Sequence, residues 1–163
     1  DILMPPISAI ELNIAIAMGG VTRGVVVAAG AVFCMNFFVN FDFLHIWAII
    51  FFGVSGSLLL ALIGIITGIW SEKFDHLGTI TNFIIVPLSF LSGTFYSVKR
   101  MPDAAMILIE YNPFFYVIDG FRYGFTGISD GSLLFGVIFI SLLNFLLFLL
   151  SFILFRSGWR LKN

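Results

Sequence analysis

Residues 43–71 form an apolar run without a single Asp, Glu, Lys or Arg. A helix needs about 20 mostly apolar residues to cross the hydrocarbon core of a bilayer. Three further runs meet this requirement, at residues 14–39, 77–98 and 131–155, and only the first of them contains a charge, at Arg23. The runs are long and continuous, whereas the strands of a membrane barrel would be short with every second residue polar. We therefore predict a single all-α integral membrane domain with four transmembrane helices.

The composition supports a membrane protein for a second reason. Of the 163 residues, 60% are hydrophobic and 10% are charged, and the mean hydropathy is +1.11. A soluble domain carries about 25% charged residues, so this chain has too little polar surface to cover a water-soluble globule. The formal net charge of −1 offers no basic face for a nucleic acid. We expect membrane lipid, and no nucleic acid, among its partners.

Basic residues indicate how the spans are oriented. Four spans place both ends of the chain on one side, and that side would carry five Lys or Arg residues against three on the other. Cytoplasmic segments carry the excess of Lys and Arg, so we expect residues 1–13 and the tail at residues 156–163 in the cytoplasm. Residues 99–130 would then lie on the outer side. The chain begins with Asp1 rather than Met, and we expect that it is cut from a longer protein.

Residues 112–125, NPFFYVIDGFRYGF, are too polar for a span and too aromatic for an ordinary outer loop. Asn112 is suited to cap a helix that begins at Pro113. Asp119 and Arg122 are three residues apart, so on a helix they would share a face and pair, which lowers the cost of entering a region of low dielectric. The residues alone leave two interpretations open. The segment is either a re-entrant helical hairpin with a function or an amphipathic loop that anchors to lipid.

Several residues predict how the helices bend and pack. Pro87 lacks an amide hydrogen and should bend or break the third span near its middle. Asn82, Ser92 and Asn144 are suited to hydrogen-bond between helices. Glycines four residues apart allow helices to approach closely, although ordinary bundle packing also explains them. The three pairs are Gly20 with Gly24, Gly64 with Gly68, and Gly120 with Gly124.

The sequence lacks the common motifs of cofactor and metal chemistry. It has no G-x-x-x-x-G-K-[ST] phosphate loop, no C-x-x-C and no H-E-x-x-H. His45 and His76 fall at opposite membrane faces in the predicted topology, so they would not share a metal. No predicted span carries a charged residue at its centre, as a proton relay would require. We therefore predict no catalytic residue, no metal site and no cofactor in this chain.

Three stretches resemble the ABC-2 family of permeases of ATP-binding-cassette exporters. NFIIVPLSFLSGTFYSVKRMP is similar to the family pattern N-F-x-x-x-P-L-x-F-L-S-G-x-F with a later Pro, and NPFFYVIDGFRYGF is similar to N-P-x-x-Y-x-x-x-x-x-R. The opening DILMPPISAIEL resembles the family's cytoplasmic segment D-L-L-x-x-P-[IL]-S-x-x-E. The resemblance runs over essentially the whole chain. The matching positions are Asp1, Leu3, Pro6, Ser8 and Glu11, then Asn82, Phe83, Pro87, Leu88, Phe90, Leu91, Ser92, Gly93, Phe95 and Pro102, then Asn112, Pro113, Tyr116 and Arg122.

The resemblance implies a subunit of six spans, of which this chain would hold the third to the sixth. It also implies a dimer of permease copies in the inner (plasma) membrane of a bacterium, each copy docked on a separate ATPase that binds ATP and Mg²⁺. The cargo would be amphiphilic or lipid-linked. Residues 99–130 would fold back into the outer leaflet as short re-entrant helices, which favours the functional interpretation of residues 112–125.

The resemblance implies roles for particular residues as well. The segment before the first span, with a secondary contact in the short inner loop, would receive the motion of the ATPase. These coupling residues would be Asp1, Leu3, Pro5, Pro6, Ser8 and Glu11, with Glu72 and Lys73 in the loop. The outer segment would close the translocation path through Asn112, Pro113, Tyr116, Asp119, Phe121 and Arg122. Two rival functions are a lipid-modifying membrane enzyme, with Asp119, Arg122 and Asp130 as its one polar cluster, and a non-catalytic channel or scaffold subunit.

Overall fold

Long apolar helices make up most of the protein. The computed structural model describes residues 7–39, 43–71, 78–93 and 109–157, and the regular structure of these residues is entirely helical. The three longest helices are α1 (Ala9–Met35), α2 (Ile46–Trp70) and α7 (Leu133–Ser157). Each is long and apolar enough to cross a membrane. They correspond to the first, second and fourth predicted spans, so an all-helical protein with these three span candidates is confirmed.

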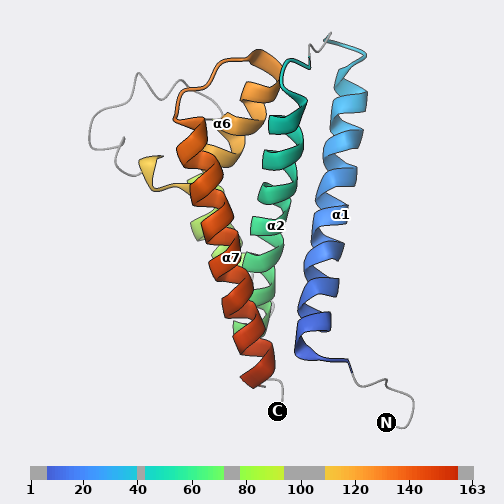
Figure 1. The fold of residues 1–163 in the computed structure, drawn as a ribbon, viewed down its shortest axis with the longest axis vertical. Helices are drawn as coiled ribbons and strands as arrows, with labels where there is room; N and C mark the ends of the chain where they lie inside the picture. The colour runs from blue at the N-terminus through green and yellow to red at the C-terminus, as the bar shows by residue number, and fades with distance from the viewer. Residues whose placement is uncertain (1–6, 40–42, 72–77, 94–108, 158–163) are drawn as a thin grey trace.

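The three long helices stand side by side, with α2 in contact with both α1 and α7 (Figure 1). The first turn of α1 and the last turn of α7 lie at the same end of this bundle. A shorter helix, α6 (Pro113–Thr126), lies at the opposite end and packs on both α2 and α7. The bundle therefore separates the start of α1 from α6 by the length of the long helices.

The third predicted span has an irregular helix. Its described part runs over Gly78–Phe90, where a π-helical turn, η1 (Thr81–Ile85), leads into a short α-helix, α4 (Val86–Phe90). The backbone amide of Val86 donates to a carbonyl five residues earlier. Pro87 follows directly, and a proline ring clashes with the carbonyl four residues before it in an α-helix. The widened turn lies where that clash would fall, while a bend of the helix at Pro87 stays a prediction.

This third helix (Gly78–Phe90) ends earlier than the sequence predicted. Residues 91–93 form a turn in which Gly93 has a φ of 77°, a left-handed value that glycine adopts without strain. The remaining predicted residues, at position 77 and at 94–98, lie outside the described residues. The described helix is shorter than a span requires, so the count of four spans stays a prediction.

Small residues set the close approach of α1 to α2. A Cβ atom added at Gly20 would lie 2.5 Å from an alanine Cβ of α2, and one added at Gly24 would lie 2.3 Å from a serine hydroxyl of α2. This first glycine pair is therefore a helix contact, as its spacing predicted. The pair Gly64 and Gly68 differs, because added Cβ atoms there would meet no atom of the described chain within 4 Å.

Two asparagines form buried polar links between the long helices. The Asn13 side chain on α1 donates to the Phe148 carbonyl on α7 at 3.3 Å and accepts from the Ser151 hydroxyl at 3.0 Å. Asn144 on α7 donates to the Ser55 carbonyl on α2 at 3.0 Å, which confirms its predicted interhelical bond. Its Oδ1 is buried and has no hydrogen-bond partner among the residues that the structure describes. The first link is therefore fully satisfied, and the second is satisfied only on its donor side.

Replacing these two asparagines with leucine is expected to have unequal effects. Asn13→Leu should lower the free energy of unfolding by about 1 kcal/mol, the usual size of an interhelical hydrogen bond in a membrane, because both bonds of the Asn13 side chain to α7 are lost, while Ser151 keeps the Phe148 carbonyl as an acceptor. Asn144→Leu should change it by less than about 0.5 kcal/mol, because one bond is lost together with an unsatisfied buried acceptor. Thermal unfolding of both variants in the same detergent compares them. Equal destabilisation by the two substitutions would contradict the difference in hydrogen bonding between Asn13 and Asn144.

Candidate functional site

Helix α6 has a defined start and a defined end. The Asn112 side-chain oxygen accepts a hydrogen bond from the Phe114 amide at 3.0 Å, and Pro113 occupies the first helical position. Gly127 ends the helix with a φ of 70°, the left-handed conformation common at helix C-termini. The predicted cap and start are confirmed. The resulting helix has 14 residues, too few to cross a bilayer.

One face of α6 lies directly against α2. A Cβ atom added at Gly120 would lie 2.2 Å from the ring of Phe52, and one added at Gly124 would lie 2.2 Å from Cγ1 of Ile49. The Cβ atom added at Gly124 would also lie 3.1 Å from the Ile49 nitrogen of α2 and 3.2 Å from the carbonyl oxygen of His45, the residue before α2. Side chains of α2 therefore pack directly on the backbone of α6 at these two glycines. The close approach predicted from the Gly120 and Gly124 spacing is confirmed.

The two aromatic residues assigned to the translocation path lie in different surroundings. Tyr116 is 8% exposed, packs against Phe135 and Phe139 of α7, and donates from its hydroxyl to the Glu110 carbonyl at 3.0 Å. Phe121 instead lines an apolar cavity of about 500 Å³ between α6, α1 and α2. Tyr116 thus holds α6 to α7, while Phe121 faces an open space. Their roles in transport stay predictions.

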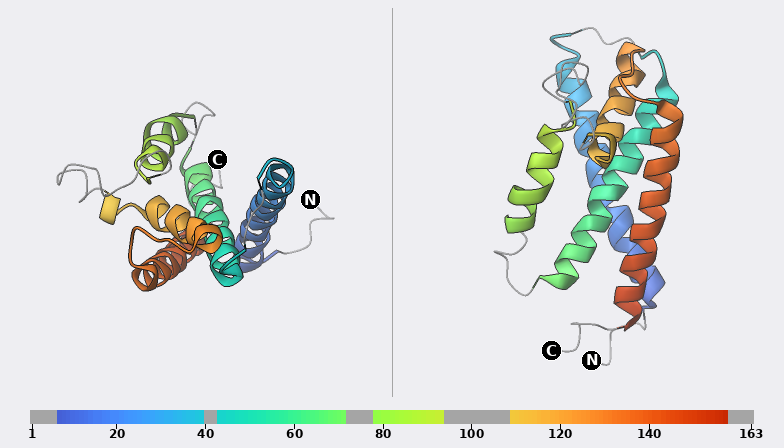
Figure 2. Two further views of the ribbon diagram at one scale, coloured as in Figure 1. Left: turned by 90° about the horizontal axis from the view of Figure 1, so that it is seen from above. Right: turned by 90° about the vertical axis from the view of Figure 1, so that its left-hand side faces the viewer.

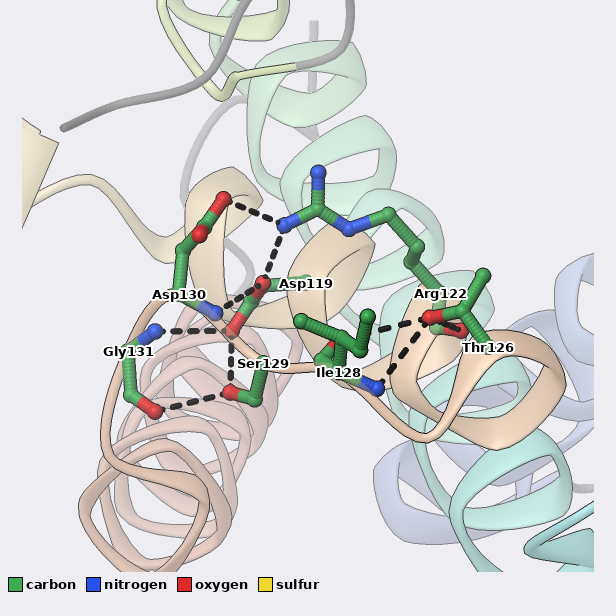
Figure 3. A network of polar contacts seen from close by, with 7 residues as sticks. All are labelled: Asp119, Arg122, Thr126, Ile128, Ser129, Asp130 and Gly131. Atoms are coloured by element: carbon green, nitrogen blue, oxygen red, sulfur yellow. Dashed lines mark hydrogen bonds and ion pairs between the residues drawn. The ribbon is translucent and has the colours of Figure 1, made fainter. Parts of the chain in front are cut away.

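Asp119 is the centre of a polar network that closes the connection between α6 and α7 (Figure 3). Its Oδ1 accepts from the Arg122 guanidinium at 2.6 Å and from the Asp130 amide at 3.0 Å. Its Oδ2 accepts from the Ser129 hydroxyl at 2.7 Å and from the Gly131 amide at 3.1 Å. The carboxylate is 3% exposed and has a donor for each of four bonds. The predicted pair with Arg122 is confirmed, and it belongs to a larger network.

Arg122 joins two carboxylates across the same connection. Its Nη2 lies 2.6 Å from Asp119 and 2.7 Å from Asp130, as Figure 3 shows. The Arg122 side chain is 37% exposed, whereas those of Asp119 and Asp130 are 4% and 11% exposed. The Arg122 guanidinium is therefore partly solvated while it pairs with two carboxylates that are largely shielded from water. These pairs offset the cost of removing the two carboxylates from water.

The environment of Asp119 determines its charge. Burial of the carboxyl favours its neutral form and would raise its pKa. The two backbone amides, the serine hydroxyl and the guanidinium favour the charged form more strongly, so the pKa of Asp119 is lowered from its ordinary value. Asp119 is therefore a carboxylate at neutral pH, suited to fixing the connection in one conformation.

Asn112 makes a second hydrogen bond that the sequence did not indicate. Its Nδ2 donates to the Leu88 carbonyl of α4 at 2.7 Å, and the side chain is 2% exposed. Asn112 and Leu88 are 24 positions apart, and the acceptor belongs to the backbone. Every residue has a backbone carbonyl, so the residue type at position 88 gives no sign of this contact. Neither spacing nor composition could therefore predict it.

Two of the coupling residues form the cap of α1. The Ser8 hydroxyl accepts from the Glu11 amide at 3.3 Å, and the Glu11 carboxylate accepts from the Ser8 amide at 2.8 Å, which is a capping box. The cap starts α1 at Ala9, so residues 9–13 of the predicted coupling segment are already helical. The other coupling residues lie outside the described residues; they are Asp1, Leu3, Pro5, Pro6, Glu72 and Lys73.

Long apolar helices with a short capped helix folded against one end define a multi-pass membrane protein of helical type. Comparison with known proteins identifies the family. The family described as ABC-2 type transporter matches residues 2–126, and the chain belongs to this family. The resemblance found in the sequence motifs is therefore confirmed.

Curated relatives of this chain are named inner membrane transport permease YadH. The relatives from Escherichia coli strain K12, Escherichia coli O157:H7 and Shigella flexneri are each 33% identical to it over 163 residues. The match covers 98% of this chain and 63% of each relative, so the chain spans about three fifths of their length. No solved structure matches the chain significantly.

Proposed function

We propose that this chain is a part of the membrane-spanning permease subunit of an ATP-binding-cassette exporter. In this proposal four spans cross the inner membrane of a bacterium, α6 folds back into the outer leaflet, and both ends of the chain face the cytoplasm. Two permease copies, a homodimer, enclose a path for an amphiphilic or lipid-linked cargo, and a separate subunit binds ATP and Mg²⁺. Family membership and the printed name of the relatives support this function.

The observation that carries the proposal is the packing of α6 against one end of the bundle. Six of its residues are buried within the protein; they are Phe114, Phe115, Tyr116, Asp119, Gly120 and Gly124. An amphipathic helix that merely anchors to lipid would instead turn its apolar face to the acyl chains. Burial of that face within the protein favours a re-entrant helix at the outer end of a path.

The polar cluster gives little support to a lipid-modifying enzyme. Asp119 accepts four hydrogen bonds, and Arg122 pairs with both Asp119 and Asp130. A nucleophile or general base needs a reactive atom within reach of a substrate. These side chains bind one another and the backbone of the α6–α7 connection, which fits a structural role in a transport subunit without its own catalysis.

The proposed mechanism passes motion from the ATPase to α6 through contacts between helices. Motion would enter at the segment before α1, whose start is fixed by the Ser8 and Glu11 cap. The Asn13 and Ser151 bond ties this end of α1 to α7. At its opposite end, α7 follows the α6–α7 connection, where the Gly131 amide donates to Asp119 of α6. Displacement of α1 would therefore be transmitted along α7 to α6.

The partner ATPase provides the test of this proposal. Affinity purification of the complete permease from its native membranes should recover a phosphate-loop ATPase, identified by mass spectrometry, together with hydrolysis of Mg-ATP. Deleting residues 1–11 should reduce that recovery at least about tenfold, the effect of losing roughly 1.4 kcal/mol of binding. Deleting residues 158–163, on the same predicted side, is the control and should preserve it. Recovery of no ATPase by the intact permease would refute the proposal.

A further inference from the structure

The third helix (Gly78–Phe90) lies largely outside the packed bundle. None of the residues in η1 or α4 is buried, and Phe83 in η1 is 77% exposed. Figure 2 shows this helix to one side of the long helices, and its contacts with the described bundle are concentrated on α6. Burial begins only after its end, at Ser92 and Gly93. Among the described residues, the contacts of this helix with the bundle therefore lie near its C-terminus.

Asn112 supplies a hydrogen bond at this end of the helix. In the last turn of an α-helix, carbonyl groups lack amides four residues ahead to bond with. The Leu91 amide donates to the Pro87 carbonyl, but the Ser92 amide donates to the Ser89 carbonyl at 3.3 Å. The Leu88 carbonyl accepts from Asn112 Nδ2 at 2.7 Å instead. The Asn112 side chain thus satisfies the Leu88 carbonyl near the end of α4.

The same side chain also begins α6. While its Nδ2 binds α4, the Oδ1 of Asn112 accepts from the Phe114 amide at 3.0 Å. The two halves of one amide group therefore fix the end of one helix and the start of another. At 2% exposed, the side chain is shielded from water that would compete for either bond.

We propose that Asn112 is a latch that holds the third helix against α6, and that this helix changes position relative to the bundle when the latch opens. The inference rests on the proposed transport function, in which the outer end of the path must open and close. The π-helical turn next to Pro87 supplies a point where backbone bonding is already irregular. Asn112 is thus a positioning residue that acts through the Leu88 carbonyl.

The two bonds of Asn112 can be separated by substitution. Ser and Asp cap helices about as well as Asn, but neither carries an amide that donates to the Leu88 carbonyl. Asn112→Ser and Asn112→Asp therefore keep the cap and remove the latch, whereas Asn112→Ala removes both. Thr126→Ala is the matched control, because the described bonds of the Thr126 hydroxyl go to the Arg122 carbonyl in α6 and to the exposed Ile128 just after it, and none reaches α4.

The experiment measures the distance between the third helix and the bundle. Spin labels are placed on cysteines introduced at Phe83 in the third helix and Leu134 in α7, which are 77% and 73% exposed, after replacing Cys34 with Ser. Pulsed electron resonance on the complete permease in lipid nanodiscs gives the distance distribution. Asn112→Ser and Asn112→Asp should raise the ratio of a second population to the main one about tenfold, the effect of one buried hydrogen bond. Thr126→Ala should leave the distribution unchanged.

Two outcomes would overturn the latch. One is that only Asn112→Ala changes the distribution, which would make Asn112 a helix cap and nothing more. The other is that no variant changes it. If Asn112→Ala does not fold, the serine and aspartate variants still decide. The distance measurement needs neither cargo nor ATPase, so its result is independent of the test of the transport function. Unchanged distances in a permease that recovers its ATPase would refute the latch alone. Altered distances in a permease that recovers no ATPase would refute only the transport proposal.

Discussion

Asp119→Ala is expected to lower the free energy of unfolding by about 3 kcal/mol and to release α6 from α7. The substitution leaves the amides of Asp130 and Gly131 without acceptors in a partly buried connection, and each unsatisfied buried donor costs about 1–3 kcal/mol. Arg122 keeps its ion pair with Asp130, and its side chain is 37% exposed. Its charge therefore stays partly solvated, and the loss of its bond to Asp119 adds less to the destabilisation. The loss should appear in thermal unfolding and as faster proteolysis between α6 and α7.

Two further variants give this prediction its controls. Asp119→Asn keeps the shape of the side chain but removes its charge. One carboxylate oxygen is replaced by an NH₂ group, which would face other hydrogen-bond donors. We therefore expect a loss of stability smaller than that of Asp119→Ala. Thr126→Ala removes an exposed hydroxyl on the same helix and should change stability by less than about 0.5 kcal/mol. Because the pKa of Asp119 is lowered by folding, its contribution is present at neutral pH and is lost as the pH falls through the pKa of the folded state. Equal stability of Asp119→Ala and wild type would show that the network does not hold the connection.

The long helices were predictable because lipid imposes a strict rule on sequence. A backbone in hydrocarbon must satisfy its own hydrogen bonds, so uncharged runs such as residues 43–71 have one stable conformation available. The corresponding helix, α2, runs over Ile46–Trp70, close to the limits of its run. Apolar composition alone did not give the true start of α1, because the Ser8 cap extends the helix beyond the apolar residues.

The third helix was less predictable because its limits depend on backbone bonding. Residues 77–98 are uncharged throughout, yet the described helix ends at Phe90 and contains a π-helical turn before Pro87. A proline predicts an irregularity in a helix, but it does not predict whether the helix bends, widens or ends there. Gly93, with its positive φ, was the residue that could have indicated the turn.

The candidate site was predicted in part for a similar reason. The spacing of Asp119 and Arg122 was enough to predict their pair, since residues three apart share a helix face. The bonds to Ser129 and Gly131 depend on how the chain returns after α6, which no spacing specifies. Tyr116 and Phe121 were assigned to one path, although residues five apart point about 140° away from each other on an α-helix. Helix geometry alone could have separated them.

Gly120→Ala and Gly124→Ala are expected to weaken the contact between α6 and α2 by about 1–3 kcal/mol each, the usual cost of overpacking. The added methyl group would lie 2.2 Å from the Phe52 ring at the first position and 2.2 Å from Ile49 at the second. At Gly124 the backbone nitrogen of Ile49 is only 3.1 Å away, so a side-chain rotation cannot relieve the whole clash. Gly124→Ala should therefore be the more damaging variant. Thermal unfolding in one detergent measures both.

Gly64→Ala and Gly68→Ala are the matched controls, because they place the same methyl group on α2 where no described atom lies within 4 Å. Alanine is the better helix former by about 1 kcal/mol, so these variants should be neutral or slightly more stable in the isolated protein. The sign of the effect thus separates a glycine that a neighbouring helix requires from one that only shares its spacing. If all four variants were equally destabilised, the G-x-x-x-G spacing alone would matter and the contact of α6 with α2 would not.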